Sequence, residues 1–131
     1  MSKTIAFVTN QTSSDRLIHA AANIAKQNQT ELIIVNILDS EYELDPKVVD
    51  EHFGQAKRYK ATMRLLFSDN KLFAMREVIS GYDTHFIVTG MPGCHSSVLY
   101  DLWGSCGEKR FYTVDDTGKL IEVATKSRIA V

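Results

Sequence analysis

The chain has 131 residues, of which 44% are hydrophobic and 24% are charged, a composition typical of one globular domain with a substantial core. Its formal net charge is −1, so neither a basic nucleic-acid-binding surface nor a cationic membrane-binding stripe is indicated. The longest apolar runs, such as residues 32–35, are too short to cross a bilayer. We therefore expect residues 1–131 to form a single domain that binds neither nucleic acid nor membrane.

Two apolar strands flank an amphipathic helix at the start of the chain. Residues 4–8 form a short apolar run, and residues 31–38 form a longer, almost uninterrupted one, which is typical of strands covered on both faces of a sheet. Between them, apolar residues at helical spacing predict one buried stripe, made of Leu17, Ala21, Ile24 and Ala25. We expect Thr12 to cap this helix, with Asp15 in its first turn.

A second helix is predicted from Asp45, because aspartate is a good cap and proline, here Pro46, fits the first helical position. Its inner face is predicted to contain Val49, Phe53 and Ala56, with His52 on the surface. Residues 62–67 form a third strand that is less apolar and is therefore expected near an edge of the sheet. Residues 68–70 predict the cap of a third helix, whose buried side contains Leu72, Met75 and Ile79.

The last third of the chain holds a fourth strand at residues 85–89 and a short helix at residues 96–103. Two further strand-like runs follow, at residues 110–114 and 119–123. The residues between these two runs, Asp-Asp-Thr-Gly, are turn formers, so the pattern predicts a β-hairpin.

This alternation predicts an α/β fold with a doubly wound, mostly parallel five-stranded sheet in the order 3-2-1-4-5, followed by a C-terminal β-hairpin. In this order the switch point lies between the first and fourth strands, where ligands bind in such sheets. The loop at residues 9–11 then faces the loop at residues 90–93. A small ligand is expected between these loops.

Glycines in the second loop point to phosphate. Gly90 and Gly93 follow the fourth strand, and Gly104-Ser105 follow the short helix; bare backbone N–H groups in such loops can hold an anion. The alternatives are a tight turn at the first pair and a helix end at the second. His95 and the pair Lys109-Arg110 either neutralise a polyphosphate or are simply solvated.

The chain resembles the universal stress protein (UspA-like) family, which has an adenine-nucleotide α-hydrolase-like fold. The resemblance is clearest in residues 7–11, followed by residues 15–18 and Ala25, and in the glycine set. ATP-binding members carry Gly, two residues, Gly, nine residues, then Gly and Ser or Thr, whereas ten residues separate Gly93 from Gly104 here. The resemblance implies a homodimer and ATP or another adenine nucleotide, contacted by Thr9, Asn10, Ile37, Gly90, Gly93, Gly104 and Ser105.

A different function stays open, namely a dimeric interaction module that binds no nucleotide. The hairpin leaves an edge strand, which pairing with a second copy would protect. Trp103, with Tyr100 and Leu102, either packs in the core, covers an adenine or fills a subunit interface.

Enzymatic chemistry is not indicated. No histidine has a carboxylate spaced for a catalytic pair, and no nucleophile elbow surrounds Ser13 or Ser14. We therefore predict no catalytic residue, no metal site and at most slow nucleotide hydrolysis. Cys94 and Cys106 are expected to remain thiols, and no signal-peptide pattern precedes the first strand, which indicates a cytoplasmic protein.

Overall fold

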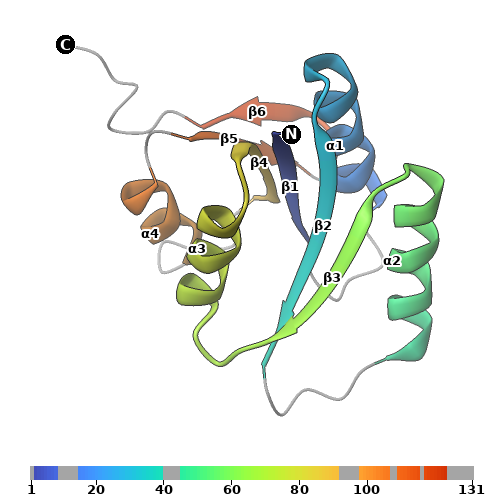
Figure 1. The fold of residues 1–131 in the computed structure, drawn as a ribbon, viewed down its shortest axis with the longest axis horizontal. Helices are drawn as coiled ribbons and strands as arrows, with labels where there is room; N and C mark the ends of the chain where they lie inside the picture. Colours follow the sequence, from blue (N-terminus) through green and yellow to red (C-terminus); the bar gives the residue numbers. More distant parts are fainter. Residues whose placement is uncertain are drawn as a thin grey trace.

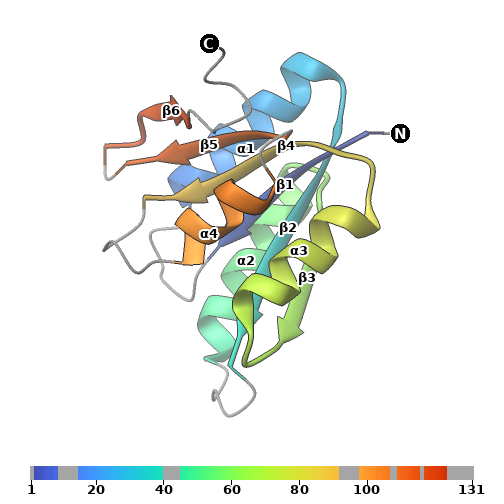
Figure 2. The same cartoon turned by 90° about the vertical axis from the view of Figure 1, so that its left-hand side faces the viewer.

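The computed structural model describes residues 2–8, 15–39, 45–91, 98–106, 109–115 and 117–123, and Figures 1 and 2 show its fold. Strands and helices alternate along the chain, as the sequence predicts. Their bounds are β1 Lys3–Val8, α1 Asp15–Asn28, β2 Glu31–Leu38, α2 Pro46–Arg58, β3 Thr62–Phe67, α3 Lys71–Gly81, β4 Thr84–Gly90, α4 Val98–Ser105, β5 Arg110–Val114 and β6 Leu120–Glu122.

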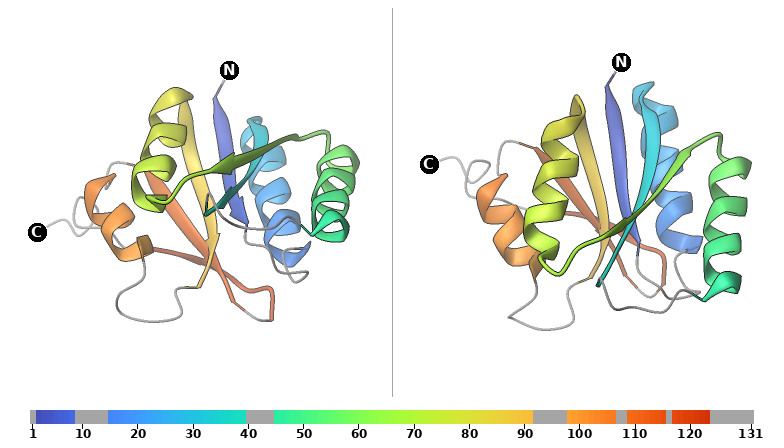
Figure 3. Two further views of the ribbon diagram at one scale, coloured as in Figure 1. Left: turned by 90° about the horizontal axis from the view of Figure 1, so that it is seen from below. Right: turned by 60° about the horizontal axis from the view of Figure 1, so that its bottom comes forward.

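The described strands form one six-stranded sheet in the order β3-β2-β1-β4-β5-β6. The first five strands are parallel, and β6 pairs with β5 in the antiparallel sense. The predicted order and the predicted hairpin are therefore both confirmed. Helices α1 and α2 cover one face of the sheet, and α3 and α4 cover the other (Figure 3).

A hydrophobic cluster fills each face of the sheet. Ala6 and Ile34 point towards α1 and α2, whereas Ile5 and Ile33 point towards α3 and α4. Alternate residues of β1 and β2 thus enter opposite clusters, so both strands are buried on both faces. This arrangement explains the nearly continuous apolar run at residues 31–38. The predicted stripe of α1 is confirmed, since Leu17, Ile18, Ala21, Ile24 and Ala25 are buried.

The predicted inner face of α2 is correct for Ala56, which is buried, but wrong for Phe53. Phe53 is 49% exposed, while His52, expected on the surface, is 1% exposed. The buried residues of α2 are Val48, His52, Gln55 and Ala56, a face turned by about one residue, or roughly 100°, from the apolar positions. Two polar side chains are buried on this face, and hydrophobic periodicity cannot identify such positions.

Side-chain caps begin α2 and α3 as predicted. The Asp45 carboxylate accepts a hydrogen bond from the backbone N–H of Lys47 at 3.0 Å, and the Asn70 side chain accepts one from Phe73 at 3.0 Å. Each bond satisfies a backbone donor that the helix itself leaves unpaired. Thr12, the predicted cap of α1, lies outside the described residues.

Candidate functional site

The switch point of the sheet lies between β1 and β4, which are neighbours at its centre. Val8 ends β1 opposite Asn36, and Gly90 ends β4 opposite Val114. Since Ala6 pairs with Val88, the two strands end at the same level. The loops predicted to bind a ligand leave the sheet here. Three predicted site residues belong to these loops and lie outside the described residues, namely Thr9, Asn10 and Gly93.

At position 90, neither the backbone conformation nor the described neighbouring atoms require glycine. The φ of Gly90 is not positive, and an added Cβ would meet only the Leu17 Cδ1 atom, at an ordinary 3.9 Å. The Thr89 hydroxyl donates a hydrogen bond to the Gly90 carbonyl at 3.0 Å. A tight turn therefore does not account for this glycine. Its bare, half-buried backbone at the switch point permits close approach of another group.

Ile37 lies one residue beyond the level at which β1 ends, since Asn36 is the partner of Val8. Its side chain is half-buried and packs at the margin of the cluster on the α3 and α4 face. The carboxyl end of β2 thus offers a partly exposed apolar group beside the switch point. An adenine ring could stack against such a surface.

Gly104 and Ser105 are not brought to Gly90. They form the last turn of α4, whose eight residues span about 12 Å. The chain then continues to the amino end of β5, as Figure 2 shows. The Ser105 hydroxyl donates to the carbonyls of Asp101 and Leu102 within the helix, at 3.0 and 3.2 Å. The interpretation of this pair as a helix end fits the structure.

Arg110 lies at the amino ends of the strands, so its predicted role beside a phosphate at the carboxyl ends is wrong. It begins β5 opposite Phe86, and its guanidinium stacks on the rings of Phe86 and Tyr112 at 5.5 and 5.6 Å. It also donates to the Glu122 carboxylate at 2.9 Å, which raises the pKa of Arg110. Lys109 directly precedes β5 and so lies at the same end of the sheet. His95, the third predicted cation, lies outside the described residues.

Two carboxylates near the carboxyl ends, Asp15 and Asp115, have hydrogen-bond partners. Asp15, in the first turn of α1, accepts a hydrogen bond from Gln55 Nε2 at 2.9 Å. Asp115 follows β5 and accepts three hydrogen bonds on one oxygen, from the N–H and hydroxyl of Thr117 and the N–H of Lys119. These bonds, chiefly that of the Thr117 hydroxyl, lower the pKa of Asp115.

Two cavities meet at Asp15, and neither is lined by Gly90 or Ile37. One, of about 340 Å³, is lined by Asp15 and by a set of α2 residues at helical spacing, Glu51, Gly54, Gln55 and Arg58. The other, of about 550 Å³, follows the outer side of α1 and is bounded by Tyr59 and by Leu120 of β6. Sequence reasoning missed both, although the helical spacing on α2 was a usable signal.

Of the two aromatic residues of α4, Trp103 packs against the core and Tyr100 is 43% exposed. Leu102 is fully buried, and Trp103 packs against the same cluster as Phe111 of β5. Tyr100 contacts Trp103 edge-on, with ring centroids 5.3 Å apart. Cys106 is a half-buried free thiol beside this cluster. Cys94 lies outside the described residues, so the expectation that both cysteines remain thiols stays a prediction.

We also looked among the described residues for a metal site, a histidine–carboxylate pair and a membrane-spanning helix. Among these described residues, no three His, Cys, Asp or Glu side chains are grouped so that they could hold a metal ion. His85 lies 3.3 Å from the Asp83 carboxylate, but both are exposed at the amino end of β4. None of the described helices combines the length and the apolar composition needed to cross a membrane.

The arrangement defines a class of protein, the doubly wound α/β proteins with a switch point between β1 and β4. No family model matches the sequence, and no curated protein gives a significant match to it. A universal stress protein family member from Burkholderia pseudomallei superposes with a TM-score of 0.63 at 15% identity, over 86% of this chain and 94% of that chain. A universal stress protein from Archaeoglobus fulgidus gives 0.62 at 15% identity, over 86% and 97%.

A third similar solved structure contains a bound ligand. It is a universal stress protein in complex with cAMP, and it superposes with a TM-score of 0.60 at 20% identity, over 77% of this chain and 86% of that chain. The chain described here therefore has the universal stress protein fold.

Proposed function

We propose that this chain is a universal stress protein-like regulatory protein that binds an adenine nucleotide at the carboxyl ends of β1 and β4. The observation that carries the proposal is Gly90, which ends β4 level with β1 and has no need of its own for glycine. The universal stress protein with bound cAMP supports the choice of ligand. The role is binding rather than catalysis.

The proposed contacts follow the strand ends. Thr9, Asn10 and Ile37 hold the base and ribose, while Gly90 and Gly93 present backbone N–H groups to phosphate. Gly104 and Ser105 are left out, because they end α4. Asp15 lies at the amino end of α1, and Arg110 is at the other end of the sheet. This charge distribution favours a nucleotide with a single phosphate group over a triphosphate.

The proposal extends to the domain organisation, the oligomeric state and the cellular location of the protein. Residues 1–131 act as a single domain and assemble as a homodimer. The proposed location is cytoplasmic, where two cysteines such as Cys94 and Cys106 would remain thiols. β3 is an edge strand of the described sheet, and this edge favours a second candidate function, namely a dimeric interaction module that works without a nucleotide.

Isothermal titration with AMP, cAMP and ATP tests the nucleotide proposal. Gly90→Val should weaken the binding of AMP or cAMP about tenfold or more, because the new side chain occupies the place of the phosphate. Gly104→Val is the matched control: nothing lies within 4 Å of its added Cβ, so its affinity should equal that of the wild type. If no adenine nucleotide gives heat at millimolar concentration, nucleotide binding is wrong and the interaction module remains.

A further inference from the structure

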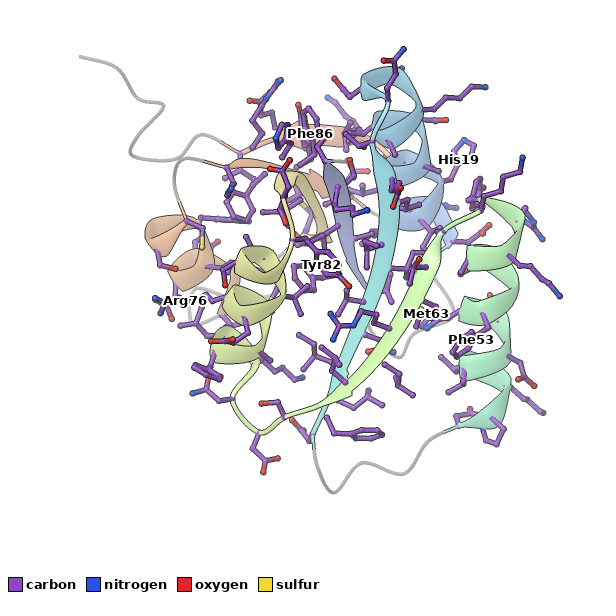
Figure 4. All side chains as sticks on the ribbon, in the orientation of Figure 1. His19, Phe53, Met63, Arg76, Tyr82 and Phe86 are labelled. Carbon is purple, nitrogen blue, oxygen red and sulfur yellow. The ribbon has the colours of Figure 1, made fainter. Side chains whose placement is uncertain are left out.

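A cavity of about 340 Å³ lies between the start of α1 and the second half of α2. The two helices lie side by side on one face of the sheet, as Figure 4 shows with His19 labelled on α1 and Phe53 on α2. Asp15 lines the cavity from the first turn of α1. The α2 residues that line it share one side of that helix, and they are Glu51, Gly54, Gln55 and Arg58. Acidic, basic and amide side chains thus border one small space.

The opposite charges around this cavity do not pair with each other. Glu51 and Arg58 are both exposed, and their separation by seven positions places them about 10 Å apart along the helix axis. Within the described residues, neither side chain takes part in a hydrogen bond or an ion pair. Asp15 accepts one hydrogen bond, from Gln55, and has no ion pair in the same part of the chain. Both signs of charge therefore remain available to a ligand.

A buried oxygen atom beside these charges also lacks a partner. Gln55 lines the cavity although it is only 5% exposed. Its Nε2 atom donates to the Asp15 carboxylate at 2.9 Å, and since a carboxylate only accepts, this bond fixes the orientation of the amide. The Oε1 atom is left without a donor in the described structure. An unpaired buried acceptor is destabilising, and an N–H group of a ligand would satisfy it.

Gly54 keeps the middle of the cavity open. Glycine inside a helix is less stable than alanine, yet Gly54 has neither a positive φ nor any atom within 4 Å of an added Cβ. The conformation and packing of the described residues therefore do not require glycine at this position. Because Gly54 lines the cavity, the missing side chain leaves space for a ligand to approach the helix backbone.

We propose that this cavity binds the zwitterion of a free amino acid. An ammonium group has three N–H donors, and the cavity lining provides three kinds of acceptor for them, the carboxylates of Asp15 and Glu51 and the buried oxygen of Gln55. Arg58, one turn beyond Gln55 on α2, receives the ligand carboxylate through two parallel N–H groups.

The mixed charge of the lining selects this class of ligand over simpler ions. A metal ion would lie beside the positive Arg58, and a simple anion would lie beside the negative Asp15 and Glu51. A zwitterion places each of its charges next to the opposite one. The inference does not rest on the proposed nucleotide site, since neither Gly90 nor Ile37 lines this cavity.

Amide chemical-shift mapping of the full chain with L-alanine tests the proposal, because the small side chain of this amino acid needs no pocket of its own. Saturable shifts are expected at Gly54 and Gln55. Ethylamine lacks the carboxylate and propionate lacks the ammonium group, so each should bind about tenfold more weakly or worse. No shifts with L-alanine at tens of millimolar, or shifts confined to residues outside α1 and α2, would overturn the site. Equal binding of ethylamine would overturn the zwitterion.

Two charge variants test the assigned contacts. Arg58→Gln removes the partner of the ligand carboxylate and should weaken the binding of L-alanine about tenfold or more. Lys57→Gln is the matched control, because Lys57 is an exposed neighbour on α2 that does not line the cavity, and its affinity should equal that of the wild type. Equal affinities of the two variants would overturn the assignment of Arg58.

A third variant separates binding from stability. Gly54→Ala adds a methyl group inside the cavity and should weaken the binding of L-alanine several-fold, although alanine favours the helix. Gly104→Ala, which also has nothing within 4 Å of its added Cβ, should leave binding unchanged. A Gly54→Ala protein that binds L-alanine as tightly as the wild type would contradict a ligand at this position. Nucleotide is absent from these experiments, so their failure leaves the nucleotide proposal unaffected.

Discussion

Gln55 donates a hydrogen bond from Nε2 to an oxygen of Asp15 at 2.9 Å and so joins α2 to the first turn of α1. Gln55 is 5% exposed, whereas Asp15 is exposed. The bond fixes the start of α1, which follows the loop after β1. It therefore connects the packing of α2 with the geometry of the switch point.

Gln55→Ala should lower the free energy of unfolding by about 1–3 kcal/mol, since it removes a hydrogen bond to a charged acceptor and leaves space in a buried position. Urea unfolding measures the change. Gln27→Ala is the control, because Gln27 is exposed on α1, and it should change stability by less than about 0.5 kcal/mol. Equal effects of the two substitutions would show that the link between α1 and α2 contributes nothing.

Two glycine substitutions should change stability in opposite directions. Gly118 has a φ of +87° in the turn between β5 and β6, and an added Cβ would lie 3.6 Å from the Arg16 side chain. Gly118→Ala should therefore destabilise the protein by about 1 kcal/mol. Gly54 lies inside α2 with nothing within 4 Å of its added Cβ, so Gly54→Ala should stabilise by about 0.5–1 kcal/mol. Thermal unfolding of both variants checks the signs; a stabilising Gly118→Ala would contradict the turn geometry.

The Asp115 carboxyl should titrate below the ordinary aspartate pKa of 3.8, because its three hydrogen bonds favour the charged form. Its stabilising contribution is complete above that pH and is lost as the pH falls through the lowered pKa of the folded state. Thr117→Val removes the hydroxyl donor and should raise the pKa of Asp115 towards 3.8. NMR titration of the Asp115 carboxyl carbon measures both values, with Thr62→Val as the control.

If Asp115 titrates at or above its ordinary value in the wild type, the hydrogen bonds of the hairpin turn are not formed as described. The stability difference between Thr117→Val and the wild type provides a second check. It should shrink on acidification, because a protonated Asp115 gains little from the Thr117 hydroxyl, which only the wild type has.

Hydrophobic pattern predicted the alternation of strands and helices, and the common order of doubly wound sheets then gave the strand order. The run at residues 31–38 predicted a strand covered on both faces, and the less apolar run at residues 62–67 predicted an edge strand. The pattern failed on α2. There, His52 and Gln55 are buried and Phe53 is exposed, and only tertiary contacts select that face.

The candidate site was less predictable. Gly104-Ser105 resembled the second half of a phosphate-binding pattern, with one residue more than its usual spacing, but α4 continues through both residues. Arg110 seemed close to the glycines along the chain, yet a strand carries it to the opposite end of the sheet. Distance along the chain does not reveal the end of the sheet at which a residue lies. Gly90, predicted to follow the fourth strand, is the last residue of that strand, and the nucleotide contacts predicted for Gly90 and Ile37 stay predictions.

Amide chemical-shift mapping during titration with cAMP and AMP tests the central claim most directly, since it reports both binding and its location. The account predicts saturable shifts at Gly90 and Ile37, with little change at Gly104 and Arg110. Saturable shifts confined to Gly104 and Arg110, or no shifts at millimolar nucleotide, would contradict a nucleotide site at the carboxyl ends of β1 and β4.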